Sequence, residues 1–435
     1  MKKLLYLGAM ITFIGSFSLV GYQKTQAASS QAPLVSVRLC SSAPVGVGGD
    51  AHIVQGIWHG VSVATASWRA RFKRVGLNLV APLDLDDAKS DGSAVDPAKE
   101  ASNARTCLGD RAAMGYVGTL NSSMAQVSEP ILNRGGMAMI SPSNTNPILT
   151  NPLVRSTYEP LYASHRLKYP TYYRVVTTDA LQGPVGAIYM KSLGITNFYL
   201  VDDQQTYGAG LAQHMAAWAT GHLGMSEVGS GHLDTSSTAA TATSAAAVAR
   251  QVVAKKPQAI YCGCDEPYSG PMLAAARRQG FTGYYFGGDA INDVSFGTKY
   301  AGGVANLYKT YSTTVGNPAA TPKSFLKLEH KYYPGWIPGP YDTFSYDAAD
   351  IILSAVYKSK LAGTLKGNAF QRRSSILKYI GGGHFNEPGI GPFHFDKNGD
   401  TSVRVLSVWN WKGSTWSLLK VFYSKDIPAS IRPTP

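Results

Sequence analysis

Cysteine, charged side chains and long apolar runs are all scarce in this sequence. Four cysteines in 435 residues do not make a disulfide scaffold. Charged residues are only 15% of the chain and hydrophobic residues are 44%, a balance that excludes a disordered chain and supplies two hydrophobic cores. Beyond residue 20, no apolar run approaches the ~18 residues of a membrane-spanning helix. We therefore expect a soluble globular protein whose length suits two domains.

Common catalytic motifs are also missing. The sequence has no G-x-S-x-G elbow, no P-loop lysine motif and no H-E-x-x-H, and its nine histidines are dispersed. Gly46–Ala51 fits the dinucleotide pattern G-x-G-x-x-A, but six residues separate it from the preceding strand. Arg69 and Arg71 stand where that pattern needs an acidic residue. We therefore expect no catalytic residue, no metal ion and no cofactor, although a secreted hydrolase with a dispersed triad stays open as an alternative.

The first residues have the order of a secretory signal peptide. Met1–Lys3 is basic, Leu4–Val20 is almost wholly apolar, and Tyr22–Ala28 is polar and small. We expect cleavage near Ala27, so that residues 1–27 are the signal peptide of a periplasmic or otherwise extracytoplasmic protein. The alternative is an uncleaved anchor, because the apolar run is just long enough to span a bilayer.

Basic residues outnumber acidic ones without forming a block. The net charge is +13, and it becomes +10 once residues 1–27, with Lys2, Lys3 and Lys24, are removed. The positive residues are scattered, with nothing longer than pairs such as Arg277-Arg278. We interpret this charge as attraction to an acidic cell surface or as simple solubility, and we expect no nucleic-acid partner.

The cysteines allow more than one interpretation. Cys262 and Cys264 lie in a strand-like run, so their side chains point to the same face. Metal binding stays open, but no neighbouring histidine or second cysteine pair completes a site, and the pattern favours two packed thiols. Cys40 and Cys107 could form a bridge in an exported protein, which the sequence alone does not settle.

Short apolar strands alternate with helical patterns from Leu34 onward. The first part of this rhythm has strands at 34–39, 77–85, 114–117 and 137–140, with helices at 54–68, 96–108 and after Ser123. The second part has strands at 197–201, 259–261 and 283–286, helices at 211–223, 271–279 and 346–361, and a linker-like stretch at 236–247 before a helix that ends near Ala254. Such alternation predicts two α/β units with parallel sheets covered on both faces.

The turn after the strand at 114–117 carries Asn121, Ser122 and Ser123. Ser123 and Gln126 have the S-x-x-Q spacing of a capping box, which predicts that Ser123 caps the following helix. A strand-to-helix turn also gathers free N–H groups and hydroxyls at the carboxyl edge of a sheet, where a carboxylate can bind. Both interpretations stay open on this stretch.

Further polar turns follow other strands. They lie at residues 141–145, 202–207 and 287–289. In a parallel sheet these strand ends share one edge, and ligands bind in the crevice outside that edge. Two sheets that face each other by such edges would place hydroxyls on one wall and carboxylates on the other, which suits a zwitterion.

Three segments carry a family resemblance. Residues 116–150 (YVGTLNSSMAQVSEPILNRGGMAMISPSNTNPILT), 202–212 (DDQQTYGAGLA) and 391–400 (GPFHFDKNGD) resemble the substrate-binding proteins of branched-chain amino-acid ABC importers. The likeness runs from about Val35 to about Val421. It implies the type 1 periplasmic binding fold, in which two Rossmann-like lobes with parallel sheets are joined by a three-segment hinge and enclose a ligand cleft. It also implies a small-molecule ligand, an amino acid or an analogue, and an ABC permease as partner.

Carried over residue by residue, the resemblance implies five ligand-binding residues. Ser122 and Thr145 would donate hydroxyl hydrogen bonds to the ligand carboxylate, helped by backbone groups at Ser143. Tyr207 would line the cleft from the second lobe, and Asp289 would accept the ligand ammonium. The alternative for Asp289 is structural, because aspartate often satisfies a turn or caps the residues that follow.

Four departures from the family pattern concern the pocket. The position of Asp289 is commonly glutamate, and neither the loop Pro44–Ala51 nor Cys264 supplies the aromatic residue that relatives often have there. The segment Arg155–Tyr173, with five tyrosines, is longer than usual. These changes argue against a leucine-like side chain and favour a larger, polar or non-amino-acid ligand.

The resemblance also implies a domain order. We expect the signal peptide at 1–27, lobe 1 at 33–177, lobe 2 at 178–310, and return segments at 311–392 for lobe 1 and 393–430 for lobe 2. The expected function is an exported solute-binding protein that captures an amino acid or a related small organic solute for an ABC permease. An extracellular ligand sensor of the same fold is the first alternative, and the secreted hydrolase is the second.

Overall fold

The computed structural model describes residues 35–45, 51–316 and 321–428. The expected signal peptide and most of the loop Pro44–Ala51 lie outside the described residues. Within the described ranges, no helix combines the length and the hydropathy that crossing a membrane requires.

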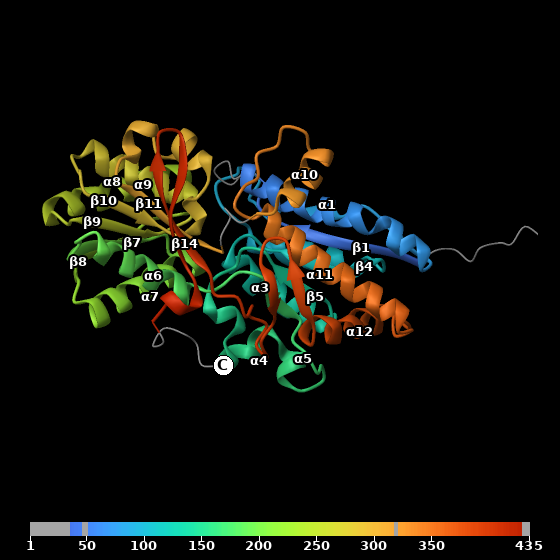
Figure 1. Cartoon of the computed structure of the whole chain (residues 1–435). Helices are drawn as coiled ribbons and strands as arrows, with labels where there is room; N and C mark the ends of the chain where they lie inside the picture. The colour runs from blue at the N-terminus through green and yellow to red at the C-terminus, as the bar shows by residue number, and fades with distance from the viewer. Residues whose placement is uncertain (1–34, 46–50, 317–320, 429–435) are drawn as a thin grey trace, which may run out of the picture. The chain divides into compact units, whose positions relative to one another are not determined.

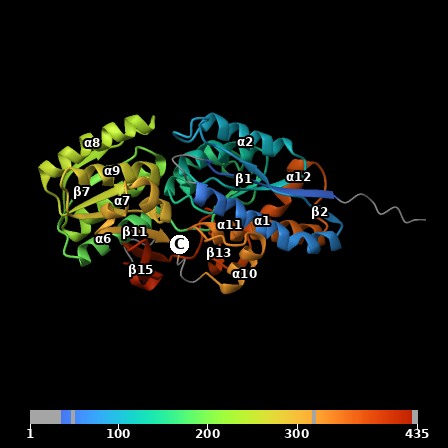
Figure 2. The same cartoon turned by 90° about the horizontal axis from the view of Figure 1, so that it is seen from above.

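The first sheet is parallel, with strands in the order β2-β1-β4-β5-β6 and with β3 also paired to β1. Its strands are β1 (Val35–Ser42), β2 (Leu77–Leu79), β3 (Leu83–Leu85), β4 (Ala113–Gly118), β5 (Ala138–Ser141) and β6 (Tyr172–Arg174). Leu39 and Val117 face one core, with helices α1 (Ala51–Arg74), α11 (Asp342–Leu361) and α12 (Ala369–Gly381). Cys40 and Tyr116 face the other core, with α2 (Pro97–Gly109) and α3 (Ser122–Arg134). Figure 2 shows α1 and α2 on opposite sides of β1.

The second sheet has the order β15-β14-β11-β10-β9-β7-β8 and is parallel from β8 to β11, with β14 and β15 antiparallel at one edge. Its strands are β7 (Asn197–Asp202), β8 (Ser226–His232), β9 (Ala259–Gly263), β10 (Tyr284–Gly287), β11 (Thr310–Val315), β14 (Leu406–Lys412) and β15 (Thr415–Phe422). Val201 and Ile260 face α8 (Thr238–Lys255) and α9 (Glu266–Arg278). Phe198 and Tyr261 face α6 (Asp179–Ser192) and α7 (Thr206–Leu223). Figure 1 shows these two helix pairs on either side of the strands.

We call the first sheet with its helices lobe 1 and the second sheet with its helices lobe 2. The chain connects the two sheets three times, after β6, after β11 and between β13 and β14. This arrangement confirms the predicted α/β fold with two lobes and parallel sheets, while the residue-level lobe boundaries stay a prediction. The remaining elements are α4 (Arg155–Tyr158), α5 (Pro160–Ala163), α10 (Lys323–Tyr332), the hairpin β12 (His384–Glu387) and β13 (Gly391–His394), and the short helices η1 (Pro147–Thr150), η2 (Pro152–Val154), η3 (Asp289–Ile291), η4 (Phe296–Tyr300), η5 (Val304–Leu307) and η7 (Ser424–Asp426).

Two elements differ from the prediction. The linker expected at 236–247 is wrong, because most of this stretch is helix α8, which Ser237 caps by accepting a hydrogen bond from the Ala240 N–H. Alanine has the highest intrinsic helix propensity, and serine is a favoured cap. The strand expected at 77–85 is two short strands, β2 and β3. Pro82 lies between them and has no N–H to donate to a ladder.

Both cysteine pairs are disulfides, and the described residues contain no free cysteine. Cys40 and Cys107 join β1 to α2, with Cα atoms 6.2 Å apart. Cys262 and Cys264 are bonded to each other with Cα atoms 5.3 Å apart, so the prediction of two packed thiols is wrong. β9 ends at Gly263, so Cys264 lies just past the strand, where the chain leaves the extended conformation and the two Cα atoms come within the usual range for a disulfide.

Candidate functional site

The turn between β4 and α3 brings Ser122 to the site. Helix α3 begins at Ser122 with Asn121 as its N-cap, and no side chain caps it. The prediction that Ser123 is the cap is therefore wrong, because a capping side chain acts from the position before the first turn. The Gln126 side chain bonds to Tyr158 instead. Ser122 is 1% exposed, and its buried hydroxyl has no hydrogen-bond partner among the described residues. The first N–H groups of any helix also lack an intrahelical acceptor.

The turn after β5 is clamped to the end of β4. The Ser143 hydroxyl donates to the carbonyls of Thr119 and Leu120, at 3.1 and 3.0 Å. Asn144 Nδ2 donates to the same two carbonyls, at 2.9 Å each. The Ser143 N–H, which sequence reasoning assigned to the ligand, donates to Ser141 Oγ at 3.2 Å. This turn is therefore held next to Ser122 by bonds within the protein.

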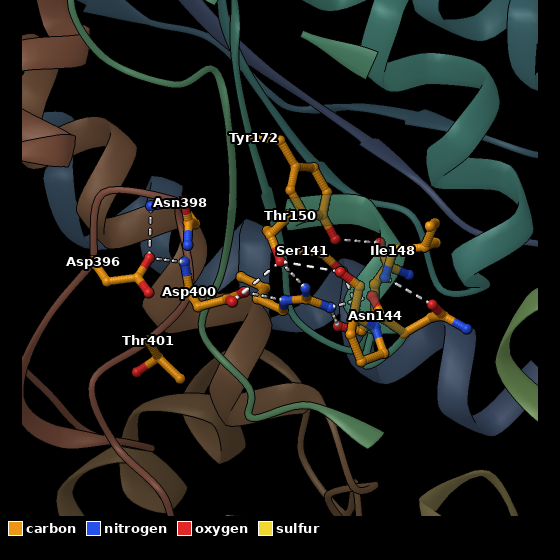
Figure 3. Close-up of polar contacts among 12 residues, drawn as sticks. Ser141, Asn144, Ile148, Thr150, Tyr172, Asp396, Asn398, Asp400 and Thr401 are labelled. Carbon is orange, nitrogen blue, oxygen red and sulfur yellow. Dashed lines mark hydrogen bonds and ion pairs between the residues drawn. The ribbon is translucent and has the colours of Figure 1, made fainter. Parts of the chain in front are cut away.

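A buried arginine joins this turn to the loop 391–400. The Arg174 side chain is fully buried, and its Nε donates to Asp400 Oδ1 at 2.6 Å. Its Nη1 donates to the carbonyls of Asn144 and Asn146, at 3.2 and 2.7 Å. Thr150 contacts both Arg174 and Asp400, and Figure 3 shows Asn144, Thr150 and Asp400 converging on this network. The loop 391–400 therefore fixes the position of the turn after β5 through Asp400 and Arg174.

Asp289, in the turn after β10, accepts three hydrogen bonds. Its Oδ1 accepts from Gln182 Nε2 at 2.8 Å and from the Tyr207 hydroxyl at 2.9 Å, and its Oδ2 accepts from the Tyr341 hydroxyl at 2.7 Å. Residue 288 must be glycine for the Tyr207 hydroxyl to reach Asp289, since a Cβ on Gly288 would lie 2.2 Å from the Tyr207 hydroxyl oxygen. Burial raises the pKa of Asp289, while the three donors favour its charged form. Two oxygens that only accept are typical of an ionised carboxylate.

A cavity of about 20 Å³ lies between the start of α3 and Asp289. Ser122, Ser143, Tyr207 and Asp289 line it, and the fifth predicted residue, Thr145, does not. Thr145 lies beside Asp179, whose backbone N–H donates to the Thr145 carbonyl at 2.9 Å. The pKa of Asp179 is raised well above its usual range by burial and by the charge of Asp289. The other lining residues are Ile53, Leu120, Asn121, Asp265, Glu266, Ala290 and Tyr341, so the long segment Arg155–Tyr173 does not reach the cavity.

Sequence reasoning missed three polar residues of this lining. Asp265 and Glu266 follow β9 directly, so the rule that ligands meet the carboxyl ends of parallel strands could have found them. Asp265 Oδ2 accepts from Asn121 Nδ2 at 2.8 Å, which links the two lobes. Tyr341 lies 52 residues from Asp289, and no local pattern marks it. Among the described residues, no group of three or more metal-binding side chains occurs.

His52 on α1 forms another bridge to lobe 2. Its Nδ1 lies 2.8 Å from Asp293 Oδ2, and its Nε2 lies 2.8 Å from the Ile337 carbonyl oxygen. A carboxylate and a carbonyl have no proton to donate, so both contacts are hydrogen bonds only when the imidazole carries two protons. The hydrogen bond to Asp293 raises the pKa of His52 against the opposing effect of burial. Burial acts to raise the pKa of Asp293, but the contact with His52 and the hydrogen bonds from Ser295 together lower it.

We expect the stabilisation from His52 to be complete below about pH 6.5, the ordinary histidine pKa, and to be lost as the pH rises through the raised pKa of the folded protein. The loss should be about 1 kcal/mol, the net value of one hydrogen bond. Thermal unfolding of the wild type and of the His52→Asn variant, measured over the pH range in which histidine titrates, checks this. The difference in Tm between the two proteins should become smaller as the pH rises. Two other titratable groups near His52, His59 and Asp342, are present in both proteins. The pKa of His59 is lowered to about 4 by burial and by His52. The effect of their titration on Tm therefore largely cancels in the comparison. A difference in Tm that does not change with pH would contradict the assignment of two protons to the His52 imidazole.

Known solute-binding proteins resemble this chain in sequence. A leucine-specific-binding protein of Salmonella typhimurium is 25% identical over 301 residues, which cover 68% of this chain and 71% of that protein. An amino acid binding protein of Pseudomonas aeruginosa is 23% identical over 372 residues, covering 84% of this chain and 87% of that protein.

Solved structures share the fold. A leucine binding protein from Thermotoga maritima matches with a TM-score of 0.70 at 21% identity, covering 90% of this chain and 100% of that chain. An ABC transporter solute binding protein from R. palustris, in complex with benzoate, matches with a TM-score of 0.69 at 16% identity, covering 89% of this chain and 96% of that chain. The family model described as periplasmic binding protein matches residues 90–413, most of the sequence. The predicted resemblance is thus confirmed, and the chain belongs to the periplasmic binding protein family.

Proposed function

We propose that this protein is exported, captures an amino acid or a related small organic solute, and delivers it to an ABC permease. One observation carries the proposal: the buried hydroxyl of Ser122, which has no partner among the described residues, lies at a helix N-terminus and lines the same cavity as the carboxylate of Asp289. A helix N-terminus attracts an anion, and a buried carboxylate attracts a cation. A cavity that offers both suits a zwitterion. The relatives named for leucine and amino acid binding support the same class of solute.

Each predicted residue has a role in this proposal. Ser122 donates its hydroxyl hydrogen bond to the solute carboxylate, and Asp289 accepts from the ammonium group. Ser143 and Tyr207 shape the cavity between these two groups. Thr145, which does not line the cavity, joins the carboxylate site only when the cavity widens around a solute. No covalent step is part of the proposal.

The cavity size implies movement of the lobes. About 20 Å³ holds about one water molecule, which is too little for an amino acid. A solute therefore enters when the lobes move apart about their three connections, and the lobes close over it. The bonds from Tyr341 to Asp289 and from Asn121 to Asp265 link the lobes, so they break and form again in each cycle. An extracellular sensor would use the same cleft, and no feature of the described residues favours it over transport.

A thermal-shift screen of the purified protein against amino acids, amides and small aromatic acids tests this function. A solute at 100 times its Kd should stabilise the folded protein by about 2.7 kcal/mol, which raises Tm by several degrees for a protein of this size. A flat response across all three classes contradicts the proposal.

Changing Ser122 to alanine should weaken solute binding by about 1–3 kcal/mol, the range for a hydrogen bond to a charged partner. The free energy of unfolding should change little, because the hydroxyl has no partner to lose within the described residues. Calorimetric titration measures the first quantity, and denaturant unfolding measures the second.

Ser123→Ala is the matched control for this change. Ser123 is the next residue in the same helical turn, and it neither caps α3 nor lines the cavity. Its replacement should leave affinity unchanged and alter stability by no more than about 0.5 kcal/mol. If Ser122→Ala keeps full affinity but costs about 1 kcal/mol of stability, as the loss of a helix cap does, then Ser122 is a structural residue.

A further inference from the structure

His52 and Asp293 lie at the edge of the cavity, one on each lobe. Ile53, the residue after His52 on α1, lines the cavity, and so does Ala290, three residues before Asp293. His52 Nδ1 and Asp293 Oδ2 are 2.8 Å apart, so this contact spans the space between the lobes. It therefore forms when the lobes close and breaks when they move apart.

Lobe 1 by itself holds the His52 ring in place. His52 Nε2 lies 2.8 Å from the Ile337 carbonyl oxygen, and the ring stacks on Trp336 with the ring centroids 4.6 Å apart. Trp336 Nε1 donates to Asp342 Oδ2 at 2.6 Å, which ties this loop to the start of α11. The contact of His52 with lobe 1 needs only one proton on the imidazole, the proton on Nε2 that is donated to Ile337.

Lobe 2 holds the carboxylate of Asp293, whose side chain is 2% exposed. The Ser295 N–H donates to Asp293 Oδ1 at 2.9 Å, and Trp416 Nε1 donates to the Asp293 backbone carbonyl at 2.9 Å. Asp293 Oδ2 points to His52. A carboxylate has no proton to donate, so His52 Nδ1 carries a second proton when the lobes are in contact. The open and the closed protein therefore differ in the protonation of one nitrogen atom.

The other titratable groups around His52 in lobe 1 are Asp342 on α11, His59 on α1, and Glu329 and His330 on α10. The charge of Asp342 raises the pKa of His52. Burial and the charge of Asp342 raise the pKa of Glu329 to about 9. In lobe 2, Glu266 accepts from the Ser295 hydroxyl that also donates to Asp293. Of the groups named here, Asp293 is the one that meets His52 directly across the two lobes.

We propose that the protein takes up a proton at His52 Nδ1 when its lobes close, so that solute binding is coupled to pH. The proton comes from solvent, forms the hydrogen bond to Asp293, and returns to solvent when the lobes open. This inference rests on the proposed function and adds the proton to it as a second ligand. Each ligand then raises the affinity for the other by the same factor.

The direction of the effect follows from the number of bound protons. The closed protein binds the solute and holds the additional proton, so a low pH favours binding. The gain in affinity should be complete below about pH 6.5, the ordinary histidine pKa, and should be lost as the pH rises through the raised pKa of His52 in the closed protein. A rise in pH therefore favours release of the solute.

Calorimetric titration with leucine tests the inference, since two relatives are named for leucine binding. At about pH 7.5, above the ordinary histidine pKa, the titration is repeated in phosphate, HEPES and Tris, which differ in their heat of ionisation. The dependence of the observed heat on the buffer gives the number of protons taken up. The wild type should take up a fraction of one proton, and its Kd should rise by a factor of roughly three or more between about pH 6 and about pH 8. In the His52→Asn variant, both effects should disappear.

His232→Asn is the matched control. His232 Nδ1 lies 2.9 Å from Asp202 Oδ2, so these two residues form the same kind of pair. Both lie in lobe 2, on the neighbouring strands β8 and β7, and their contact does not depend on lobe closure. This change should leave the proton uptake and the pH dependence of Kd as they are in the wild type. An equal loss of proton uptake in the two variants would overturn the role of His52.

The outcomes separate this inference from the proposed function. Leucine binding without proton uptake, or with an uptake that persists in the His52→Asn variant, overturns the inference and leaves the solute-binding function standing. If leucine does not bind, small-angle X-ray scattering of the protein without solute decides. The radius of gyration of the wild type should increase as the pH rises, because the lobes open, and that of the His52→Asn variant should stay constant. The same pH dependence in both proteins overturns the inference, while the wider solute screen decides the function.

Discussion

Asp289→Asn is expected to lower the affinity for an amino acid by a factor of about 100 or more, roughly 3 kcal/mol. The change keeps the shape of the side chain and removes its charge. An ammonium group enclosed between closed lobes then loses its counter-ion, and an unpaired buried ion costs several kcal/mol. Asp289 is 2% exposed, so water cannot take over the role of its carboxylate.

Calorimetric titration of the Asp289→Asn variant measures this loss, and Tyr341→Phe is the matched control. Tyr341→Phe removes one hydrogen bond to Asp289 and keeps the charge, so its effect should be nearer 1 kcal/mol, the net value of one hydrogen bond. If the Asn variant binds its solute as tightly as the wild type does, Asp289 is structural or the solute carries no ammonium group.

Asp400→Asn is expected to lower the free energy of unfolding by about 3–5 kcal/mol, the cost of breaking a buried ion pair from one side. The Arg174 side chain is fully buried while that of Asp400 is 27% exposed. The cost therefore arises at Arg174, which would keep its charge without a partner. Because Arg174 also holds the carbonyls of Asn144 and Asn146, affinity for the solute should fall together with stability.

Denaturant unfolding compares this variant with Asp396→Asn, the same change in the same loop. Asp396 accepts hydrogen bonds from the backbone N–H groups of Asn398 and Asp400, and an amide oxygen can accept them as well. Its replacement should cost no more than about 0.5–1 kcal/mol. Equal losses of unfolding free energy in the two variants would mean that the loop stabilises the protein through its own turn and not through the ion pair with Arg174.

Local patterns were sufficient to predict most of the fold and part of the site. Apolar runs separated by turns located β1, β4, β5, β7, β9 and β10. The rule of carboxyl strand ends pointed to the turns that hold Ser122, Tyr207 and Asp289, and the family resemblance then singled out these three residues, which line one cavity. Asp265 and Glu266 obey the same rule, since they follow β9 directly, but the prediction did not include them.

Other features could not be read from a local pattern. The contacts of His52 with Asp293 and of Tyr341 with Asp289 join residues 241 and 52 positions apart, and they exist only because the lobes meet. The error at Ser123 has a different origin. A capping box fixes the start of a helix only to within one or two residues, and here that uncertainty decides which serine lines the cavity.

A crystal structure of the protein with a bound amino acid tests the central claim most directly. It should show the solute carboxylate within hydrogen-bond distance of Ser122 Oγ and the N-terminus of α3, and the ammonium group on Asp289. A solute bound away from this cavity, or bound here with Asp289 in contact only with Gln182, Tyr207 and Tyr341, would contradict the account.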